Sequence, residues 1–248
     1  MLRKSVGLEL SRAQILGFRR RAGLLDERLP ASAKSLRFAA WAGLQDSMPR
    51  AALLSIHARV KGCHADHWEH PSLVQLWGPR FNVYVVAEKD LPVFSLARLP
   101  DDARRRARAQ DTALRLQSFL DGRRMPCGQA GGAWILADDE AAFQLSNSQP
   151  AAPARLLPSG DAYYLWWGTD REILVPDAKR RAELWTTRVW PGALLVNGEI
   201  AGVWRRSAAE VSIDTWRRLS SAEWEGVEAE AAALPLPGLN GRIAIHRS

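Results

Sequence analysis

The sequence predicts an α+β protein whose two halves are built differently. In the first half, apolar residues recur at helical spacing in three segments, and two β-rich runs around a Gly-Pro-Arg turn at 78–80 follow them. In the second half, short apolar runs rich in tryptophan and β-branched residues alternate with turn residues, which is typical of strands. The predicted organisation is an N-terminal region over 1–125, a junction over 126–160 and a C-terminal region over 161–248.

Length and composition exclude several classes of protein. The chain has 248 residues, 47% hydrophobic and 25% charged, so it can bury a core and is not fully disordered. No stretch approaches 18 consecutive apolar residues, and no apolar segment follows the basic N-terminus. We therefore expect no membrane span and no secretory signal, and we place the protein in the cytoplasm.

The cysteines and histidines give little support for a metal centre. Cys63 and Cys127 form no C-x-x-C pair, which excludes a zinc ribbon or a redox motif. Cys63 lies close to His64, His67 and His70, but this spacing matches no standard zinc pattern. The nucleotide-binding, zinc-protease and serine-hydrolase motifs are also missing. We predict that the protein uses no metal and no small-molecule cofactor.

Three helices and a hairpin are predicted in the N-terminal region. The helices are expected at residues 11–25, 34–44 and 47–60, and the hairpin at 73–86. Ser11 and Gln14 have the spacing of a capping box, and Ser47 can cap a third helix that has Pro49 in its first turn. This order is that of a winged helix, in which a helix-turn-helix places its third helix in a DNA groove and the hairpin is the wing.

The remaining segments alternate between predicted strands and helices. Strands are expected at 91–98, 163–167, 171–176, 192–206, 210–216 and 242–248, and helices at 101–121 and 221–233. Asn197-Gly198 is a strong hairpin signal, and Ser220 with Glu223 repeats the capping-box pattern. Residues 146–160 have the composition of a linker. The C-terminal region therefore reads as a small β-barrel or curled antiparallel sheet closed by a helix.

The charge is distributed unevenly. Residues 1–125 hold 22 Lys+Arg and 12 Asp+Glu, whereas residues 126–248 hold 12 and 15, for a net charge of +7. A basic half is expected where a protein faces a polyanion, and coding bias towards arginine does not explain the asymmetry. We predict double-stranded DNA as the partner of a monomeric protein, with RNA or an acidic protein as the alternative.

Candidate DNA-contacting residues lie on or beside the predicted helices and hairpins. They are Arg37, Arg50, Arg59, Lys61, Trp77, Arg80, Arg205 and Arg206. Arg80 at the hairpin tip is expected to reach phosphates or a narrow minor groove. Ordinary surface charge is the alternative for each basic residue, and Arg205 and Arg206 fit a barrel rim equally well. We expect His57 and most of the 11 tryptophans to be core residues.

Four stretches resemble one bacterial family, the winged helix DNA-binding domain proteins that include the DNA glycosylases AlkZ and YcaQ. The stretches are 10–25, 43–60, 76–86 and 190–206, the last ending in the specific pattern Gly-x-Trp-Arg-Arg. The resemblance implies tandem winged helices packed on a C-terminal β-barrel, with a basic channel that holds duplex DNA. It also implies hydrolysis of the N-glycosidic bond of alkylated purines, including crosslinked ones.

The chain departs from this family at two places. Segment 123–143 passes directly from the first winged-helix region to the lead-in of the barrel, so the middle of the family fold is predicted to be missing. The family enzymes carry Gln-hydrophobic-Gln, or Asp in the last position, where this chain has Gln45, Asp46 and Ser47. The resemblance makes these three the candidate catalytic residues, which would orient a water at the anomeric carbon. Asp46 is equally well explained as a cap or turn residue.

Three functions follow from the sequence. The first is a double-stranded DNA-binding relative of alkylation and crosslink repair glycosylases with impaired catalysis. The second is an active monofunctional alkylpurine glycosylase that tolerates both departures. The third is a non-enzymatic protein that binds an acidic partner.

Overall fold

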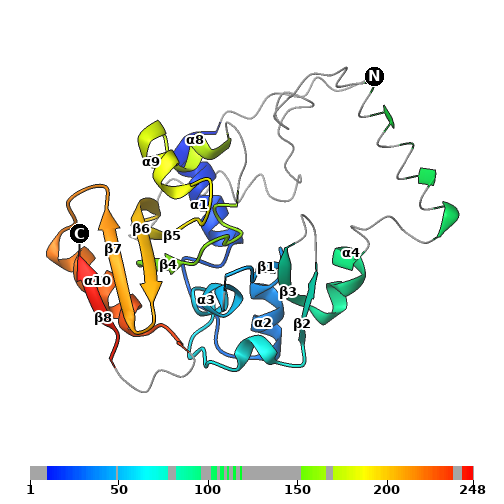
Figure 1. Ribbon diagram of the computed structural model, residues 1–248, viewed down its shortest axis with the longest axis horizontal. Helices are drawn as coiled ribbons and strands as arrows, with labels where there is room; N and C mark the ends of the chain where they lie inside the picture. The colour runs from blue at the N-terminus through cyan, green and yellow to red at the C-terminus, as the bar shows by residue number, and fades with distance from the viewer. Residues whose placement is uncertain are drawn as a thin grey trace.

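The structure, a computed structural model, describes residues 10–48, 50–77, 82–95, 152–165, 170–236 and 242–247, with isolated positions between 102 and 118. Its described part contains two β-sheets with helices between and around them (Figure 1). Within those residues, no helix is long and apolar enough to cross a membrane.

The N-terminal part is a three-stranded antiparallel sheet with helices packed against it. Its elements are α1 (Arg12–Ala22), α2 (Ala33–Ala39), β1 (Leu44–Gln45), α3 (Ala51–His57), η1 (His67–Glu69), β2 (Leu73–Trp77), β3 (Val83–Ala87), η3 (Glu88–Asp90) and α4 (Leu91–Ser95). The strand order is β1-β3-β2, so the predicted hairpin is present and β1 extends it. A core that includes Leu36, Ile56 and Val85 joins α2 and α3 to the sheet.

Local capping signals place the first helix correctly but not the third. The Ser11–Gln14 capping box begins α1 as predicted. The predicted cap at Ser47 is wrong, because α3 starts after Arg50, which has φ 65° and makes no side-chain cap. The carboxylate of Asp46 takes over this function by accepting a hydrogen bond from the Ala52 N–H at 3.0 Å.

Helix α3 is an interior helix. All its residues are buried, between the three-stranded sheet on one side and β4 (Arg155–Leu157) on the other. A helix that enters a DNA groove needs an exposed face. The prediction that this third helix lies in a groove is therefore wrong.

The C-terminal part is a five-stranded sheet with helices on both faces. Its elements are β4, α8 (Arg171–Leu174), α9 (Ala178–Leu184), β5 (Gly192–Val196), β6 (Glu199–Ser207), β7 (Glu210–Thr215), α10 (Ser221–Ala232) and β8 (Ala244–Arg247). The order is β4-β5-β6-β7-β8, and only the β7–β8 pair is parallel. Among the described residues β4 and β8 pair with no further strand, so the sheet is open. Of the two predicted forms the barrel is wrong, and the structure has a sheet that is antiparallel except at its β7–β8 edge.

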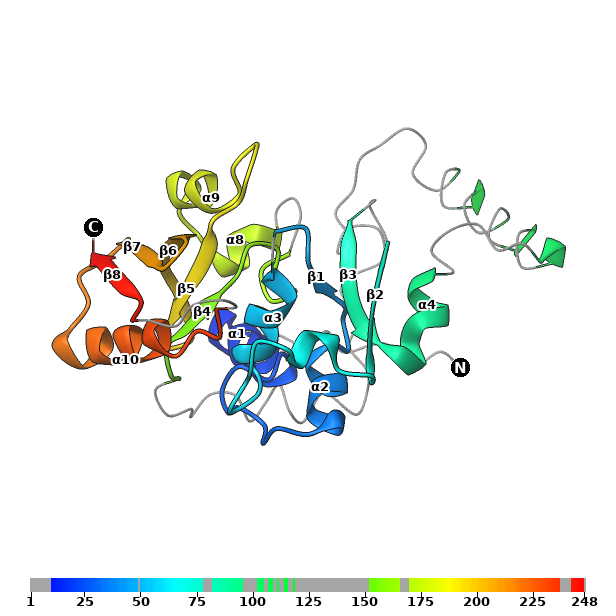
Figure 2. The ribbon, with the colours of Figure 1, turned by 60° about the horizontal axis from the view of Figure 1, so that its bottom comes forward.

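The hairpin between β5 and β6 forms at the predicted turn. Asn197 and Gly198 both have positive φ, at 50° and 81°, as a two-residue turn of this kind requires. Strand β5 is buried along its whole length. Helix α10 covers one face of the sheet with residues such as Val227, while α1, α8 and α9 cover the other (Figure 2).

Several short apolar segments adopt a different structure from the predicted one. The predicted strands at 91–98 and 171–176 contain helices α4 and α8, and residues 163–164 lie in a turn. The predicted linker at 146–160 contains β4, which is buried. Periodicity cannot distinguish strands from helices in runs this short, so neighbouring packing decides. Most of the predicted basic helix at 101–121 lies outside the described residues.

The two predicted regions share their cores. Leu16 and Leu25 from the first region pack in one cluster with Tyr164 and Leu195 from the second. Leu54 of α3 packs in another cluster with strands of the five-stranded sheet. Any site at this boundary is therefore held by packing from both sides.

Candidate functional site

The Gln45-Asp46-Ser47 segment lies where β1 leaves the three-stranded sheet. Gln45 pairs with Tyr84 of β3, and the Asp46 N–H donates to the Val83 carbonyl at 2.8 Å. Side chains one residue apart on a strand point to opposite faces, whereas those two apart share a face. Accordingly, Gln45 Nε2 donates to Ser47 Oγ at 2.8 Å, so the first and third residues of the motif converge.

Asp46 points away from this pair and supports α3. One carboxylate oxygen accepts the Ala52 N–H, and the other accepts Gln75 Nε2 at 2.9 Å. Burial raises the pKa of Asp46 above its ordinary value, although these hydrogen bonds and the charge of Arg50 oppose the rise. The structure thus places Asp46 as a capping residue, which is the alternative interpretation of this position.

The carboxamide of Gln45 lies against the backbone of Gly160. Gly160 has φ +77°, and a Cβ on it would lie only 2.9 Å from Gln45 Cδ. A side chain is therefore unfavourable here on two grounds, the backbone conformation and the contact. The C-terminal part of the chain, through Gly160, fixes where the Gln45 amide lies.

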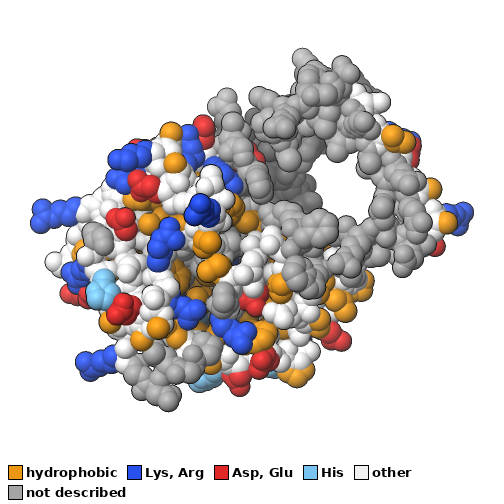
Figure 3. All heavy atoms as spheres, in the orientation of Figure 1, with side chains coloured by type: hydrophobic (Ala, Val, Ile, Leu, Met, Phe, Trp, Pro, Cys, Tyr) orange, Lys and Arg blue, Asp and Glu red, His pale blue; other side chains and the backbone are white. Residues whose placement is uncertain are grey.

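A pocket of about 210 Å³, here called the α3 pocket, opens beside this segment. Met48 and Ala51 line it from the α3 side, Pro158 and Ser159 from the segment before Gly160, and Trp190 and Trp204 from the five-stranded sheet side. Arg205 and Arg206 also line it and are exposed. In Figure 3, Lys and Arg side chains gather across this face with apolar side chains between them, over α3 and the β5–β6 strands.

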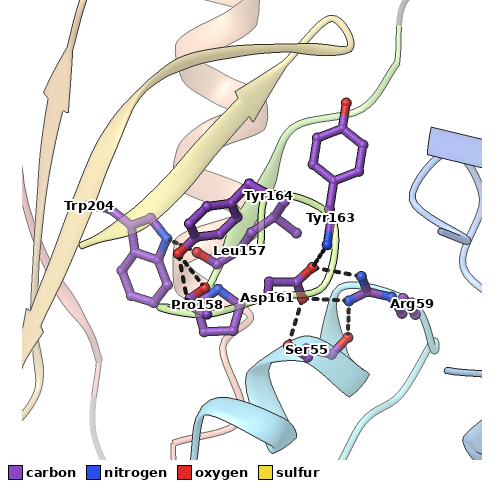
Figure 4. A network of polar contacts seen from close by, with 9 residues as sticks. Ser55, Arg59, Leu157, Pro158, Asp161, Tyr163, Tyr164 and Trp204 are labelled. Atoms are coloured by element: carbon purple, nitrogen blue, oxygen red, sulfur yellow. Dashed lines mark hydrogen bonds and ion pairs between the residues drawn. The ribbon is translucent and has the colours of Figure 1, made fainter. Parts of the chain in front are cut away.

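A buried polar network holds the segment 158–164 in place (Figure 4). The Asp161 carboxylate accepts two hydrogen bonds from Arg59, at 2.7 and 2.8 Å, and one from Ser55 at 2.6 Å. Burial alone would raise the pKa of Asp161, but the charge of Arg59 and these hydrogen bonds overcome it and hold the pKa below its ordinary value. The network ties α3 to the segment that carries Gly160.

Two aromatic side chains extend this network to the walls of the α3 pocket. The Tyr164 hydroxyl donates towards the carbonyl oxygens of Pro158 and Pro191, at 2.8 and 3.0 Å, and accepts the Gly160 N–H at 3.1 Å. Trp204 Nε1 donates to the Leu157 carbonyl at 2.8 Å. The pocket walls are therefore fixed by buried hydrogen bonds.

The structure brings together some of the predicted DNA-contacting residues. Arg205 and Arg206 line the α3 pocket, and Arg50 precedes Ala51 with its guanidinium 4.2 Å from the centre of the Trp68 ring. Arg59 is 2% exposed and bound to Asp161, so its predicted phosphate contact is withdrawn.

The other predicted contacts lie elsewhere in the chain. Arg37 lies on α2 and Lys61 beyond the end of α3, and neither lines the α3 pocket. Arg80 lies outside the described residues, as does the side chain of Trp77. Their contacts with DNA stay predictions.

The histidines of the N-terminal part are buried or hydrogen-bonded to residues near them in the sequence. His57 is buried, and burial together with the charges of Arg28 and Arg155 lowers its pKa to about 3. His67 Nδ1 accepts the His64 N–H at 3.1 Å, and His70 Nδ1 bonds to Ser72 Oγ at 2.8 Å. No group of residues in the described ranges has the arrangement of a metal site.

Two residues that complete the site, Gly160 and Asp161, have no clear signal in the sequence. Gly160 and Asp161 fell in a Pro-Ser-Gly-Asp stretch that marks a turn, but nothing in the sequence pairs Asp161 with Arg59. Trp190 packs against the first core cluster, as expected for most tryptophans, but it is half-buried and also lines the pocket.

Known proteins are similar to this chain in sequence family and in fold. Residues 116–235 match the family model described as DNA glycosylase AlkZ-like. The solved structure of the Streptomyces sahachiroi DNA glycosylase AlkZ is similar to the chain, with a TM-score of 0.67 and 15% identity, over 97% of this chain and 100% of that one. No curated protein matches the chain.

The chain has an α+β fold that is similar to the fold of the DNA glycosylase AlkZ. The match to the AlkZ-like family model and the fold shared with AlkZ agree with each other. The chain is therefore related to the AlkZ/YcaQ-type DNA glycosylases, as the four sequence stretches indicated. The predicted shortening at 123–143 lies outside the described residues and stays a prediction.

Proposed function

We propose that this protein binds duplex DNA across the face that carries the α3 pocket, as a relative of the DNA repair glycosylases with impaired base excision. One observation carries the proposal: the Gln45–Ser47 pair, the α3 pocket and the exposed Arg205 and Arg206 gather on one face from distant parts of the chain. Exposed guanidinium groups are typical phosphate ligands, and such contacts position a protein on the duplex without reading sequence.

The N-terminal part fits a winged helix in a modified form. The strand order β1-β3-β2, with helices before and between the strands, supports this assignment and makes the β2–β3 hairpin the wing. Because α3 is buried, DNA contacts fall to the wing, to Arg50 and to the C-terminal arginines rather than to a groove-binding helix.

Impaired excision follows from the third position of the motif. Ser47 is shorter than the Gln or Asp that the family enzymes carry, and its hydroxyl is hydrogen-bonded with Gln45 and Asn82. An amide or a carboxylate at this position would extend farther towards a substrate and stabilise more developing charge. A serine leaves Gln45 as the one family-like group to hold a water.

An active alkylpurine glycosylase is the second candidate. The convergence of Gln45 and Ser47 beside a tryptophan-lined pocket favours it, because two polar groups on one face are the minimum needed to orient a water. An alkylated purine already carries positive charge, so its departure needs little protonation.

Two measurements test these proposals. Fluorescence anisotropy across a salt series should give log K against log salt with a slope near −4.5 if about five phosphates are contacted, and a slope near zero would overturn DNA binding. Base release from a duplex containing N7-methylguanine should be slow and should increase in Ser47→Gln, which restores the family pattern. Rapid release by the unmodified protein that is abolished in Gln45→Ala would establish the second candidate instead.

A further inference from the structure

The β2–β3 hairpin brings a fourth polar residue, Asn82, to the candidate catalytic segment. Strand β1 pairs with β3 in a register that places Gln45 opposite Tyr84, and the same register continued by two residues places Ser47 opposite Asn82. Residues two apart on a strand share a face, so Gln45, Ser47 and Asn82 lie on the same face of the sheet. The side chains meet accordingly, because Ser47 Oγ donates to Asn82 Oδ1 at 3.3 Å.

The hydrogen-bonding capacity of the Ser47 hydroxyl determines what it can offer a ligand. A hydroxyl has one hydrogen to donate and two lone pairs that accept. The carbonyl oxygen of Asn82 has no hydrogen of its own, so it takes the hydroxyl hydrogen, and Gln45 Nε2 donates to one lone pair. Because Ser47 is exposed, its second lone pair can accept a hydrogen bond from a water.

The Gln45 carboxamide supplies a second acceptor. Its Nε2 is bound to Ser47, so Oε1 at the other end of the same planar group is an acceptor. Gly160 holds this plane in place, since Cδ, Nε2 and Oε1 of Gln45 all lie 2.9 to 3.1 Å from the position of a Cβ on Gly160. Two acceptors on one face can take both hydrogens of one water and leave its oxygen lone pairs available for attack.

We propose that Asn82 positions the attacking water by holding the Ser47 hydroxyl as an acceptor, in place of the amide or carboxylate oxygen that the family enzymes carry there. The inference rests on the proposed function, through its slow base excision, and adds the residue that lets a serine serve in the third position. Asn82 acts through Ser47, so it is a positioning residue.

The reaction that this water would carry out is balanced without a further reagent. The water oxygen forms a bond to the anomeric carbon, and the bond from that carbon to the purine nitrogen breaks. The electron pair of the broken bond neutralises the positive charge of the alkylated purine. One water hydrogen stays on the new hydroxyl group of the sugar, and the other leaves as a proton to solvent.

The test is single-turnover release of N7-methylguanine from a duplex, with the protein in excess. Asn82→Ala frees the Ser47 hydroxyl to rotate, and we expect release to slow roughly 10- to 100-fold because the water loses its orientation. Asn82→Asp keeps an acceptor oxygen at the same place and should retain most of the rate. Gln75→Ala is the matched control, because this amide lies on the same hairpin but bonds to Asp46, and it should leave release unchanged.

A double-mutant cycle tests whether Asn82 acts through Ser47. Ser47→Ala removes the hydroxyl, so adding Asn82→Ala to it should cause no further loss. If Asn82→Ala slows release equally with and without the Ser47 hydroxyl, the proposal is overturned. Unchanged release in a folded Asn82→Ala protein, or a loss that Asn82→Asp does not restore, also overturns it.

The outcomes separate this inference from the proposed function. Salt-dependent binding of the duplex with no base release by the unmodified protein removes the positioned water and leaves DNA binding standing. Binding to no duplex removes both.

Discussion

The two ends of the contact between α3 and the segment 158–164 differ sharply. Ala51, Ser55 and Arg59 are four residues apart, so they lie along one stripe of the helix and its extension and face the same segment. At the Arg59 end the contact is filled by a buried ion pair with Asp161. At the Ala51 end it is left hollow, and the α3 pocket opens there.

This difference indicates a division of roles along one helix. A buried, fully hydrogen-bonded ion pair fixes the separation of two elements because any movement exposes an uncompensated charge. The other end of the same contact can then stay open without collapsing, which a flexible junction would not allow. We infer that the closed end stabilises the junction and that the open end is the part available to a ligand.

The largest effect is expected when the closed end is broken. Asp161→Ala leaves Arg59 buried without its partner, and removal of one member of a buried pair costs about 3–5 kcal/mol. Urea unfolding measures the loss. Glu199→Ala is the control, because it breaks the exposed Arg12–Glu199 pair and should cost about 0–1 kcal/mol. Equal small losses in the two variants would contradict the assigned role of the closed end.

The next largest effect is the pH dependence of stability caused by His57, on the other face of α3. His57 has a pKa of about 3 in the folded protein because of burial and of the charges of Arg28 and Arg155, although Glu230 lies 3.8 Å from its Nε2. The unfolded state binds the proton more tightly. The stability that the neutral His57 contributes is therefore present above about pH 6.5 and is lost as pH falls towards 3.

Between pH 7 and pH 5, we expect His57 to lower the free energy of unfolding by about 2 kcal/mol. Unfolding measured at both pH values in the unmodified protein and in His57→Gln isolates the contribution, because the other titrating groups are common to both. The difference between the two pH values should be smaller in the variant. An identical difference would show that His57 takes up no proton on unfolding in this range.

The open end is tested by adding one methyl group at Gly160. Gly160→Ala places a Cβ 2.9 Å from Gln45 Cδ at φ +77°. We expect backbone strain to lower the free energy of unfolding by about 1–2 kcal/mol, and the displacement of Gln45 to add a further loss. Gly62→Ala is a matched control, since Gly62 also has positive φ but nothing lies within 4 Å of its Cβ. The excess loss in Gly160→Ala should disappear when Gln45 is changed to Ala, and an excess that persists would place the clash elsewhere.

The sequence predicted those features that are determined by a few neighbouring residues. The capping boxes at Ser11–Gln14 and Ser220–Glu223 are confirmed, as is the Asn197-Gly198 hairpin. Each capping box joins two residues three positions apart at the start of a helix, and the hairpin turn joins Val196 to Glu199. Sequence spacing therefore fixes the geometry in each case.

The sequence could not predict features that depend on distant partners. Segment 171–176 looks like a strand, but it forms α8, which packs against α1. Arg59 looks like a surface residue until Asp161, 102 positions later, is seen to bind it. Of the candidate site, the position of Gln45 was predicted from the resemblance, whereas its contact with Gly160 required the fold.

The smallest expected effect concerns the exposed charge beside the open end. Arg205→Ala removes one cation that lines the α3 pocket, and each lost phosphate contact should reduce the salt slope by about 0.9 and weaken binding alike on all sequences. Arg218→Ala removes an exposed arginine that does not line the pocket and should leave the slope unchanged. If both variants change the slope equally, binding depends on overall charge. A change confined to Arg205→Ala would instead place the DNA at the open end of the contact, beside the α3 pocket.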